Sequence, residues 1–289
     1  MSDRLQLRDL RSLDECREVV ALQEEVWGVD GETVPASVLF VSAKRAGILI
    51  GAIARVGDVG ADEPEDALAG FVWSLPGRRD ATPTHWSHML GVRPRFRSRR
   101  VGERLKLAQR AQALAQDVHL IEWTFDPLQA ANAHFNLRAL GGIGASYGVD
   151  VYGPLSGHLH RGTPTDRLFI EWWISEPHVQ RRLANREEPE ARSLIAVSSE
   201  IADAPIAIVT QASGPWLCPV GFTSDLDDRR FLVPVPPKYS EMQQSSPDLA
   251  MAWRLAVREV MVPAFARGYR AVDFYLNREA GGGAYLLAK

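Results

Sequence analysis

The chain has 289 residues, which is enough for one large α/β domain or two smaller ones. Apolar residues make up 46% and charged residues 24%, a usage that excludes collagen-like, low-complexity and intrinsically disordered chains. The formal net charge of −3 gives no overall attraction to nucleic acid or to an anionic membrane, so any anion must be bound by a local cluster of cations.

Cysteine usage and apolar runs predict a cytoplasmic protein. Cys16 and Cys218 are too few for a disulfide framework, and they lack the CxxC spacing of zinc sites, so we expect no metal. The longest apolar run, 46–54, falls short of the ~20 residues that span a bilayer. The first ten residues contain no continuous apolar segment of the kind found in signal peptides.

The first half of the chain alternates helix-like and strand-like segments. Helical spacing of apolar residues predicts a helix over Asp14–Trp27. Two apolar runs, Gly47–Val56 and Leu68–Leu75, predict a hairpin whose acidic connection, 57–66, is a surface loop. A short strand over Ser87–Val92 then leads into an arginine-rich turn.

Further elements follow that turn. They are a helix over Val101–Gln116, a strand over His119–Phe125 that ends at Asp126-Pro127, a helix over Gln129–Leu140 that stops at Gly141-Gly142, and a strand over Asp166–Ile174.

A charged segment with helix-breaking residues, 177–192, predicts the main domain boundary. We therefore expect one domain over 1–176 and a C-terminal α/β subdomain over 193–289. The strand–helix–strand order of the second resembles that of residues 87–125, so a degenerate second half of the same fold is a hypothesis. Its expected elements are strands over Leu194–Ser198, Ile206–Thr210, Phe231–Pro234 and Ala271–Leu276, and a helix over Pro247–Arg267.

The turn between Val92 and Val101 carries the clearest chemical signal. A strand that feeds a helix N-terminus leaves several backbone N–H groups pointing at one spot, where the helix dipole also favours negative charge. Eight Lys or Arg residues lie between Arg93 and Arg110, against the single acid Glu103. Gly102 lacks a Cβ and lets a phosphate approach the backbone closely. The segment therefore predicts a pyrophosphate site.

The same segment resembles the acyl-CoA motif of GCN5-related N-acetyltransferases (GNAT), in which a strand ending V-x-P is followed by Q/R-x-x-G-x-G/A and a helix. Val92, Pro94, Arg97 and Gly102 match that pattern, whereas Arg100 replaces the middle glycine. A second stretch is similar to the next GNAT motif, a strand and an asparagine-bearing helix that leads to a glycine. Its matching residues are 122–128, Asn132-Ala133, Phe135-Asn136 and Leu140-Gly141, and the resemblance covers about residues 1–175.

This resemblance implies an α/β (α+β) fold with a mixed, mostly antiparallel sheet flanked by helices. It implies acetyl-CoA or another acyl-CoA as co-substrate, with the backbone of the strand before the turn holding the pantetheine arm. The residues implied for coenzyme A are Leu90, Gly91, Val92, Arg97, Ser98, Arg99, Arg100, Val101, Gly102, Asn132 and Asn136.

Two residues are candidates for the general base. His88 lies four positions before Val92, so both side chains share one face if the strand is regular, and imidazole titrates near neutral pH. The alternative is a histidine with a structural hydrogen bond. Glu122 is the rival, because a carboxylate in an apolar strand either faces a cleft or pairs with an arginine.

The general acid is less clearly marked. Many GNAT enzymes use a tyrosine at the position that Leu137 occupies here. Tyr147 or Tyr152 are the candidates to replace it, and a water relay or a loss of catalysis are the alternatives.

Asp166-Arg167 is the candidate substrate site. The arginine suits an acceptor carboxylate or a carboxylated acyl group, although an Asp-Arg dipeptide is also common as a structural ion pair. We expect an acyltransferase that moves an acetyl or related group, such as succinyl, to the amine of a small molecule such as an amino acid. A non-catalytic acyl-CoA-binding module is the alternative. No nucleic-acid or membrane partner is expected, and homodimer formation is left open.

Overall fold

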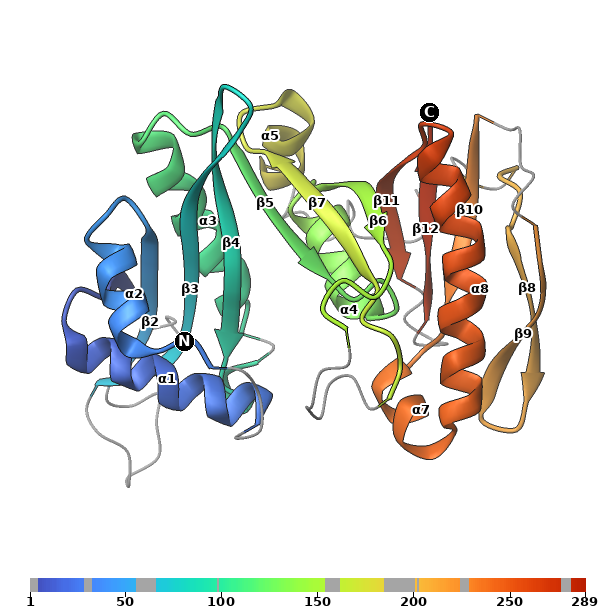
Figure 1. The fold of residues 1–289 in the computed structure, drawn as a ribbon, viewed down its shortest axis with the longest axis horizontal. Helices are drawn as coiled ribbons and strands as arrows, with labels where there is room; N and C mark the ends of the chain where they lie inside the picture. The colour runs from blue at the N-terminus through green and yellow to red at the C-terminus, as the bar shows by residue number, and fades with distance from the viewer. Residues whose placement is uncertain are drawn as a thin grey trace. The chain divides into compact units, whose positions relative to one another are not determined.

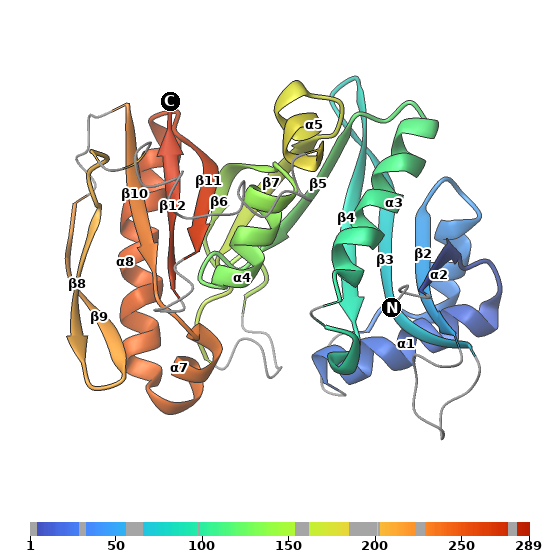
Figure 2. The same cartoon turned by 180° about the vertical axis from the view of Figure 1, so that it is seen from behind.

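The computed structural model describes residues 5–28, 33–55, 66–97, 99–153, 162–184, 201, 203–223, 229–276 and 282–289. Two compact units account for these residues: those up to Trp123 form the first, and those from Thr124 onward form the second. The helices and strands of both are labelled in Figure 1 and seen from behind in Figure 2.

The first unit is built on strands in the order β1-β2-β3-β4-β5. Neighbours from β1 to β4 pair antiparallel, whereas β4 and β5 pair in parallel. Its elements are β1 (Gln6–Asp9), α1 (Leu13–Trp27), α2 (Ala36–Ala43), β2 (Ile48–Arg55), β3 (Asp66–Arg79), β4 (Thr82–Val92), a 3-10 turn (Pro94–Phe96), α3 (Val101–Ala115) and β5 (Leu120–Phe125), whose last two residues belong to the second unit.

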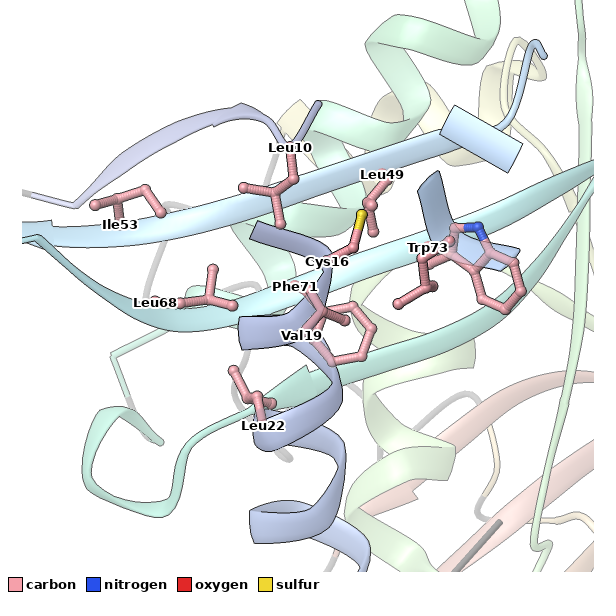
Figure 3. Close-up of a cluster of buried hydrophobic side chains, with 10 residues drawn as sticks. Leu10, Cys16, Val19, Leu22, Leu49, Ile53, Leu68, Phe71 and Trp73 are labelled. Atoms are coloured by element: carbon pink, nitrogen blue, oxygen red, sulfur yellow. The ribbon is translucent and has the colours of Figure 1, made fainter. Parts of the chain in front are cut away.

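Helix α1 shows how local sequence fixes this unit. Ser12 and Glu15 form a capping box at its first turn, each side chain accepting from the other's backbone N–H. Cys16, Val19 and Leu22 recur at helical spacing and are fully buried. They pack with sheet residues in the cluster that Figure 3 shows. Helices α1 and α2 cover one face of β2–β4 (Figure 1), and α3 covers the other (Figure 2).

Strand β4 contains one surplus residue. Trp73 of β3 lies opposite Met89, but the next residue, Ser74, lies opposite Ser87, so His88 is left out of the register. Such a bulge bends a strand and breaks the alternation of its side chains. The parallel pairing with β5 covers only Thr84–Trp86 of β4, although β4 continues to Val92. In the described part of the chain, β4 beyond Trp86 is therefore paired on one side only, with β3.

The second unit contains strands in the order β7-β6-β11-β12-β10, all paired antiparallel, and a separate β8–β9 hairpin. Helix α8 lies along β10, β11 and β12 (Figure 1). The elements are α4 (Ala130–Ala133) with a π-helix (His134–Ala139), β6 (Ile143–Gly148), β7 (Arg167–Trp173), α5 (Pro177–Ala184), β8 (Ile208–Ser213), β9 (Trp216–Phe222), β10 (Arg230–Val235), α7 (Tyr239–Ser245), α8 (Pro247–Ala266), β11 (Arg270–Leu276) and β12 (Gly283–Ala288).

The predicted mixed, mostly antiparallel sheet flanked by helices is confirmed. The predicted helix-breaking character of 177–192 is wrong over its first part. Pro177 opens α5, where proline is tolerated because a first-turn N–H has no helical partner, and Val179 is buried. The predicted strand Leu194–Ser198 and most of the predicted loop 57–66 lie outside the described residues.

The C-terminal strand–helix–strand segment and residues 87–125 have the same order of elements but pair their strands differently. Strands β4 and β5 pair directly, whereas β12 lies between β10 and β11. Among the helices of the described ranges, none combines the length and the apolar character needed to cross a membrane.

Candidate functional site

The N-terminus of α3 is open. Arg100 occupies its N-cap position, and the cap side chain makes no capping hydrogen bond. The first intrahelical bond runs from the Arg104 N–H to the Arg100 carbonyl, 3.0 Å. The amides of Val101, Gly102 and Glu103 therefore precede the helical ladder, and they are the donors that an anion can accept from.

Arg100 explains how the turn forms without the expected glycine. Its backbone has φ 58° and ψ 20°, the left-handed region that glycine enters freely and that costs other residues roughly 1–2 kcal/mol. The guanidinium then turns back and pairs with Glu103 through two bonds, 2.7 Å from Nε to Oε2 and 2.8 Å from Nη2 to Oε1. The substitution thus keeps a glycine-like backbone and directs the side chain onto the helix.

Gly102 is not required by packing. A Cβ at this position would lie 3.6 Å from Leu90 Cδ2 and 3.9 Å from Val92 Cγ2, which is ordinary van der Waals contact. Glycine in a helix is less stable than alanine by about 0.8–1.0 kcal/mol. A glycine that the protein itself does not need is what a closely approaching ligand would require.

The eight cations of the segment divide into paired and unpaired groups. Arg93 pairs with Glu25 at 3.1 Å, and Arg104 donates to the Leu5 carbonyl at 2.6 Å. Arg97 and Arg99 are exposed and form no ion pair with any residue of the described ranges. These two arginines supply uncompensated positive charge beside the turn, while Ser98 between them lies outside the described residues.

The backbone of Leu90, Gly91 and Val92 pairs with β3 on one side. Its other side has no strand pairing within the described residues, although the Val92 carbonyl accepts from Arg97 Nε at 3.4 Å. Packing requires a glycine at position 91, whereas it does not at position 102. A Cβ on Gly91 would come within 2.9 Å of Phe71 and 3.1 Å of Leu22, inside the α1 core.

The expectation that His88 and Val92 share a face is wrong, because the bulge lies between them. Val92 approaches Gly102 of α3. His88 instead packs edge-on against Trp73, with ring centroids 5.2 Å apart, and the Trp73 indole donates to Ser42 of α2 on the other face. The His88 side chain stays exposed, and partial loss of hydration lowers the pKa of its imidazole below the usual value.

Glu122 is engaged by an arginine, the second of its two expected roles. Arg79 Nη1 lies 3.2 Å from Glu122 Oε1, and the carboxylate is largely buried. A base held in this way must first give up its ion pair, so His88 is the better placed of the two candidate bases.

Tyr147 and Asp166 belong to one buried network in the second unit. Tyr147 Oη donates to Asp166 at 2.7 Å, and Arg258 of α8 donates two bonds to the same carboxylate, at 2.7 and 2.9 Å. Burial, followed by the charge of Asp166, raises the pKa of Tyr147 well above 10. Tyr147 is thus a poor acid, and the expected Asp166–Arg167 ion pair is replaced by Asp166–Arg258.

Tyr152 is exposed, and part of the Arg167 guanidinium has no hydrogen-bond partner. Tyr152 is 45% exposed, its hydroxyl lies 3.2 Å from Thr124 Oγ1, and the Arg167 guanidinium lies 5.0 Å from its ring centre. Arg167 Nε is buried without a hydrogen-bond partner, and no described residue forms an ion pair with Arg167. Burial lowers the pKa of Arg167, which reflects the cost of a partly dehydrated cation that an anionic ligand would offset.

The two predicted asparagines differ. Asn132 is exposed on α4, whereas Asn136 is 6% exposed in the π-helix, a form that often marks functional sites. The Asn136 side chain forms no hydrogen bond within the described residues, so its amide is available to a ligand. Leu137, at the expected tyrosine position, is fully buried.

Three charged residues were not anticipated: Lys106, Arg254 and Arg258. Arg254 is 1% exposed and donates to both oxygens of Asp126, at 2.8 and 2.9 Å. Lys106 is buried on the apolar stripe of α3 beside Leu105. A cation inside an apolar stripe is the signal by which Lys106 could have been found, whereas the arginine partners lie too far along the chain for any local pattern.

The chain was compared with known proteins. No protein-family model matches the chain, and no curated protein matches it. Similar solved structures include the ribosomal-protein-S18-alanine N-acetyltransferase of Escherichia coli, with 11% identity, TM-score 0.43 and coverage of 60% of this chain and 95% of that chain. An acetyltransferase of the GNAT family from Streptococcus pneumoniae has 13% identity, TM-score 0.44 and coverage of 58% and 98%. The yncA protein of Salmonella typhimurium, solved with acetyl-CoA, has 13% identity, TM-score 0.42 and coverage of 60% and 95%.

Proposed function

We propose that the chain is an acyl-CoA-dependent N-acyltransferase of the GNAT type. The observation that carries this proposal is the open N-terminus of α3, where a glycine that packing does not need, Gly102, lies among amides without helical partners. The exposed Arg97 and Arg99 add charge of the sign that a diphosphate requires. No acid of the described residues neutralises them.

Coenzyme A is proposed to bind along the turn and the end of β4. The amides of Val101 and Gly102 receive the diphosphate, and the predicted contacts of Arg97, Ser98, Arg99 and Arg100 surround it. The pantetheine arm follows the one-sided backbone of Leu90–Val92. Asn136, which is buried in the second unit, stays a proposed contact on the sequence motif alone.

His88 is the proposed base. Its exposed ring and lowered pKa keep the imidazole neutral at physiological pH, the form that accepts a proton from an incoming ammonium or amine. Among the predicted acids, only Tyr152 has an exposed hydroxyl that is not held by a carboxylate.

The proposed substrates carry a carboxylate. Arg167 is a partly buried cation with an unsatisfied Nε, and a carboxylate matches the planar fork of a guanidinium. The carboxylate belongs either to an amino-acid acceptor or to a succinyl-type donor. Replacing Arg167 by methionine separates these, because it weakens whichever reactant carries the anion.

By sequence, residues 1–176 are proposed as the catalytic segment and residues 193–289 as a degenerate half of the same fold. In support, α8 precedes the antiparallel pair β11–β12, which has a register shift, just as the α4 segment precedes the shifted pair β6–β7. The compact units divide elsewhere, at Trp123.

Calorimetry with free CoA, acetyl-CoA and succinyl-CoA tests the proposal. We expect binding by the unmodified protein, and Gly102→Glu to weaken it at least tenfold because the new carboxylate occupies the space of the phosphate and repels its charge. The same variant should leave the free protein as stable or more stable. Gly221→Glu is the matched control, since a Cβ there meets nothing within 4 Å.

Two results would contradict the proposal: no heat with any CoA ester, or unchanged affinity in Gly102→Glu. A thioester-release assay with a panel of amines then separates an enzyme from a non-catalytic acyl-CoA-binding module. The enzyme releases thiol only when an acceptor amine is present, whereas the module binds the ester and releases none.

A further inference from the structure

A buried polar cluster lies between α3 and the sheet of the first unit. Lys106 Nζ is 3.1 Å from Ser87 Oγ and 2.8 Å from Gln109 Oε1, and Gln109 Nε2 donates to Ser87 Oγ at 3.0 Å. All three residues are at least nine-tenths buried, and Lys106 is only 3% exposed. The contacts close a ring in which each residue bonds to the other two.

This cluster lies where β4 and β5 stop pairing. Ser87 is the first residue of β4 beyond the paired segment and borders the bulge. Trp123 is the first residue of β5 beyond it, and the Lys106 ammonium lies 3.8 Å from the Trp123 ring centre. The proposed path of the pantetheine arm, along Leu90–Val92, begins three residues after Ser87.

Burying the charged form of a lysine in this cluster costs free energy. Burial lowers the pKa of Lys106 well below its usual value, because the ammonium has lost its water. Its contacts include three uncharged groups, Ser87, Gln109 and the Trp123 ring, and a ring face compensates a cation only in part. An ammonium in this situation gives up a proton more readily than a solvated one.

We propose that Ser87 donates a proton to the thiolate that leaves during acyl transfer, and that Lys106 restores it through Ser87. This inference rests on the proposed acyltransferase function and fills the role for which the sequence has no tyrosine at Leu137. In this proposal Ser87 is the catalytic residue, since its hydroxyl reaches the reacting sulfur, and Lys106 returns the proton to Ser87.

The step balances without a further reactant. The amine nitrogen attacks the thioester carbonyl, the C–S bond breaks and its electron pair goes to sulfur. The Ser87 proton moves to sulfur, and a Lys106 proton moves to Ser87 Oγ. Lys106 is left neutral and is recharged by the proton that the acceptor nitrogen loses, passed through solvent.

Four variants test the relay: Ser87→Ala, Lys106→Met, their combination, and Tyr152→Phe for the rival acid. Ala111→Met places the same methionine on the exposed face of α3 as a control. We expect Ser87→Ala and Lys106→Met each to lower kcat about 100-fold, the lower range for general acid catalysis, with acetyl-CoA affinity by calorimetry changed less than threefold. The combination should be no worse than either single variant, because the two residues act as one unit.

Two readouts distinguish a proton relay from a structural role. The alkaline decline of kcat that reports loss of the acid should disappear in Lys106→Met. In the free protein, the unfolded chain binds more protons than the folded one between the lowered pKa of Lys106 and about 10.4, so stability rises with pH in that window. Lys106→Met should remove this rise, independently of activity.

Several outcomes would overturn the relay. They are unchanged kcat in either single variant, multiplicative losses in the combination, loss of the alkaline decline in Tyr152→Phe instead, or an acyl group on Ser87 by mass spectrometry. Failure of the proposed function looks different, since the unmodified protein would then neither bind a CoA ester nor transfer its acyl group.

Discussion

Helices α1 and α3 have the same length, 15 residues, but opposite N-termini. In α1, the Glu15 carboxylate accepts from the Ser12 N–H at 2.8 Å and the Arg11 N–H at 2.7 Å, so the chain supplies its own anion. In α3, the cap residue is an arginine that makes no capping bond, and the acid of the first turn, Glu103, is occupied by that arginine. A helix N-terminus can therefore bind an external anion only where the chain itself supplies none.

The largest expected effect comes from filling the open end. Arg100→Asp places a carboxylate where the proposed diphosphate binds and changes the local charge by two. We expect CoA affinity to fall at least 100-fold, about 2.7 kcal/mol, as measured by calorimetry. Thermal stability should fall slightly, because the change removes the Arg100–Glu103 pair and places a second carboxylate beside Glu103. CoA binding that survives this change would show that the diphosphate does not bind at the N-terminus of α3.

The charge beside the open end is the next target. Replacing Arg97 and Arg99 together by serine should weaken CoA binding about tenfold and flatten its dependence on salt, since fewer charge contacts are screened. The free energy of unfolding should change by less than about 0.5 kcal/mol, as is usual for exposed residues. Serine at the exposed Arg229 and Arg230 is the control, and equal losses from both pairs would show a non-specific charge effect.

Removing the Glu15 cap of α1 should lower the stability of the fold and leave CoA binding unchanged. Burial raises the pKa of Glu15, but hydrogen bonds from Arg8 and from the Ser12 and Arg11 amides outweigh it and lower the pKa to about 2. A lowered carboxyl pKa stabilises the fold above about 4.5, and this stabilisation is lost as pH falls toward 2. Glu15→Gln should cost about 1 kcal/mol at pH 7 and little at pH 2 in urea unfolding. Glu18→Gln, at an exposed position of the same helix, is the control.

The smallest effect concerns the backbone of the open end. Arg100→Gly relieves the left-handed conformation but loses the Glu103 ion pair. We expect a net gain of about 0.5 kcal/mol in unfolding free energy, with CoA affinity within threefold of the unmodified protein. A clear loss of stability would show that the Arg100–Glu103 pair outweighs the backbone cost.

Local patterns predicted the helix–strand core of the first half. The strand before the turn and helix α3 follow from periodicity and from Val92-x-Pro94, signals that act over a few residues. Helix α2 was missed because Ala36–Ala43 is apolar on nearly every side and shows no period. Strand β12 was missed because it follows a glycine-rich segment, 281–283, which has low strand propensity. Its pairing with β10 and β11 defines the strand.

The site was predictable where one segment makes it. The prediction at the turn around Gly102 needed only adjacent residues, and the structure places them at the N-terminus of α3 as expected. The face of His88 depends on the register between β3 and β4, which no single strand encodes. The partners of Asp126 and Asp166 lie on α8, 128 and 92 residues away, so charge pairing across the chain could not be read from either dipeptide.

The surplus residue in β4 makes this strand sensitive to chain length. On either side of His88 the odd and even positions exchange faces, so Ser87 and Leu90 both turn toward α3 while Met89 turns toward α1. Removing one residue here would restore a uniform zigzag and present the wrong set of side chains to each helix. A homologue that has lost a residue between Thr84 and Leu90 should therefore have rebuilt the core on one side of its sheet.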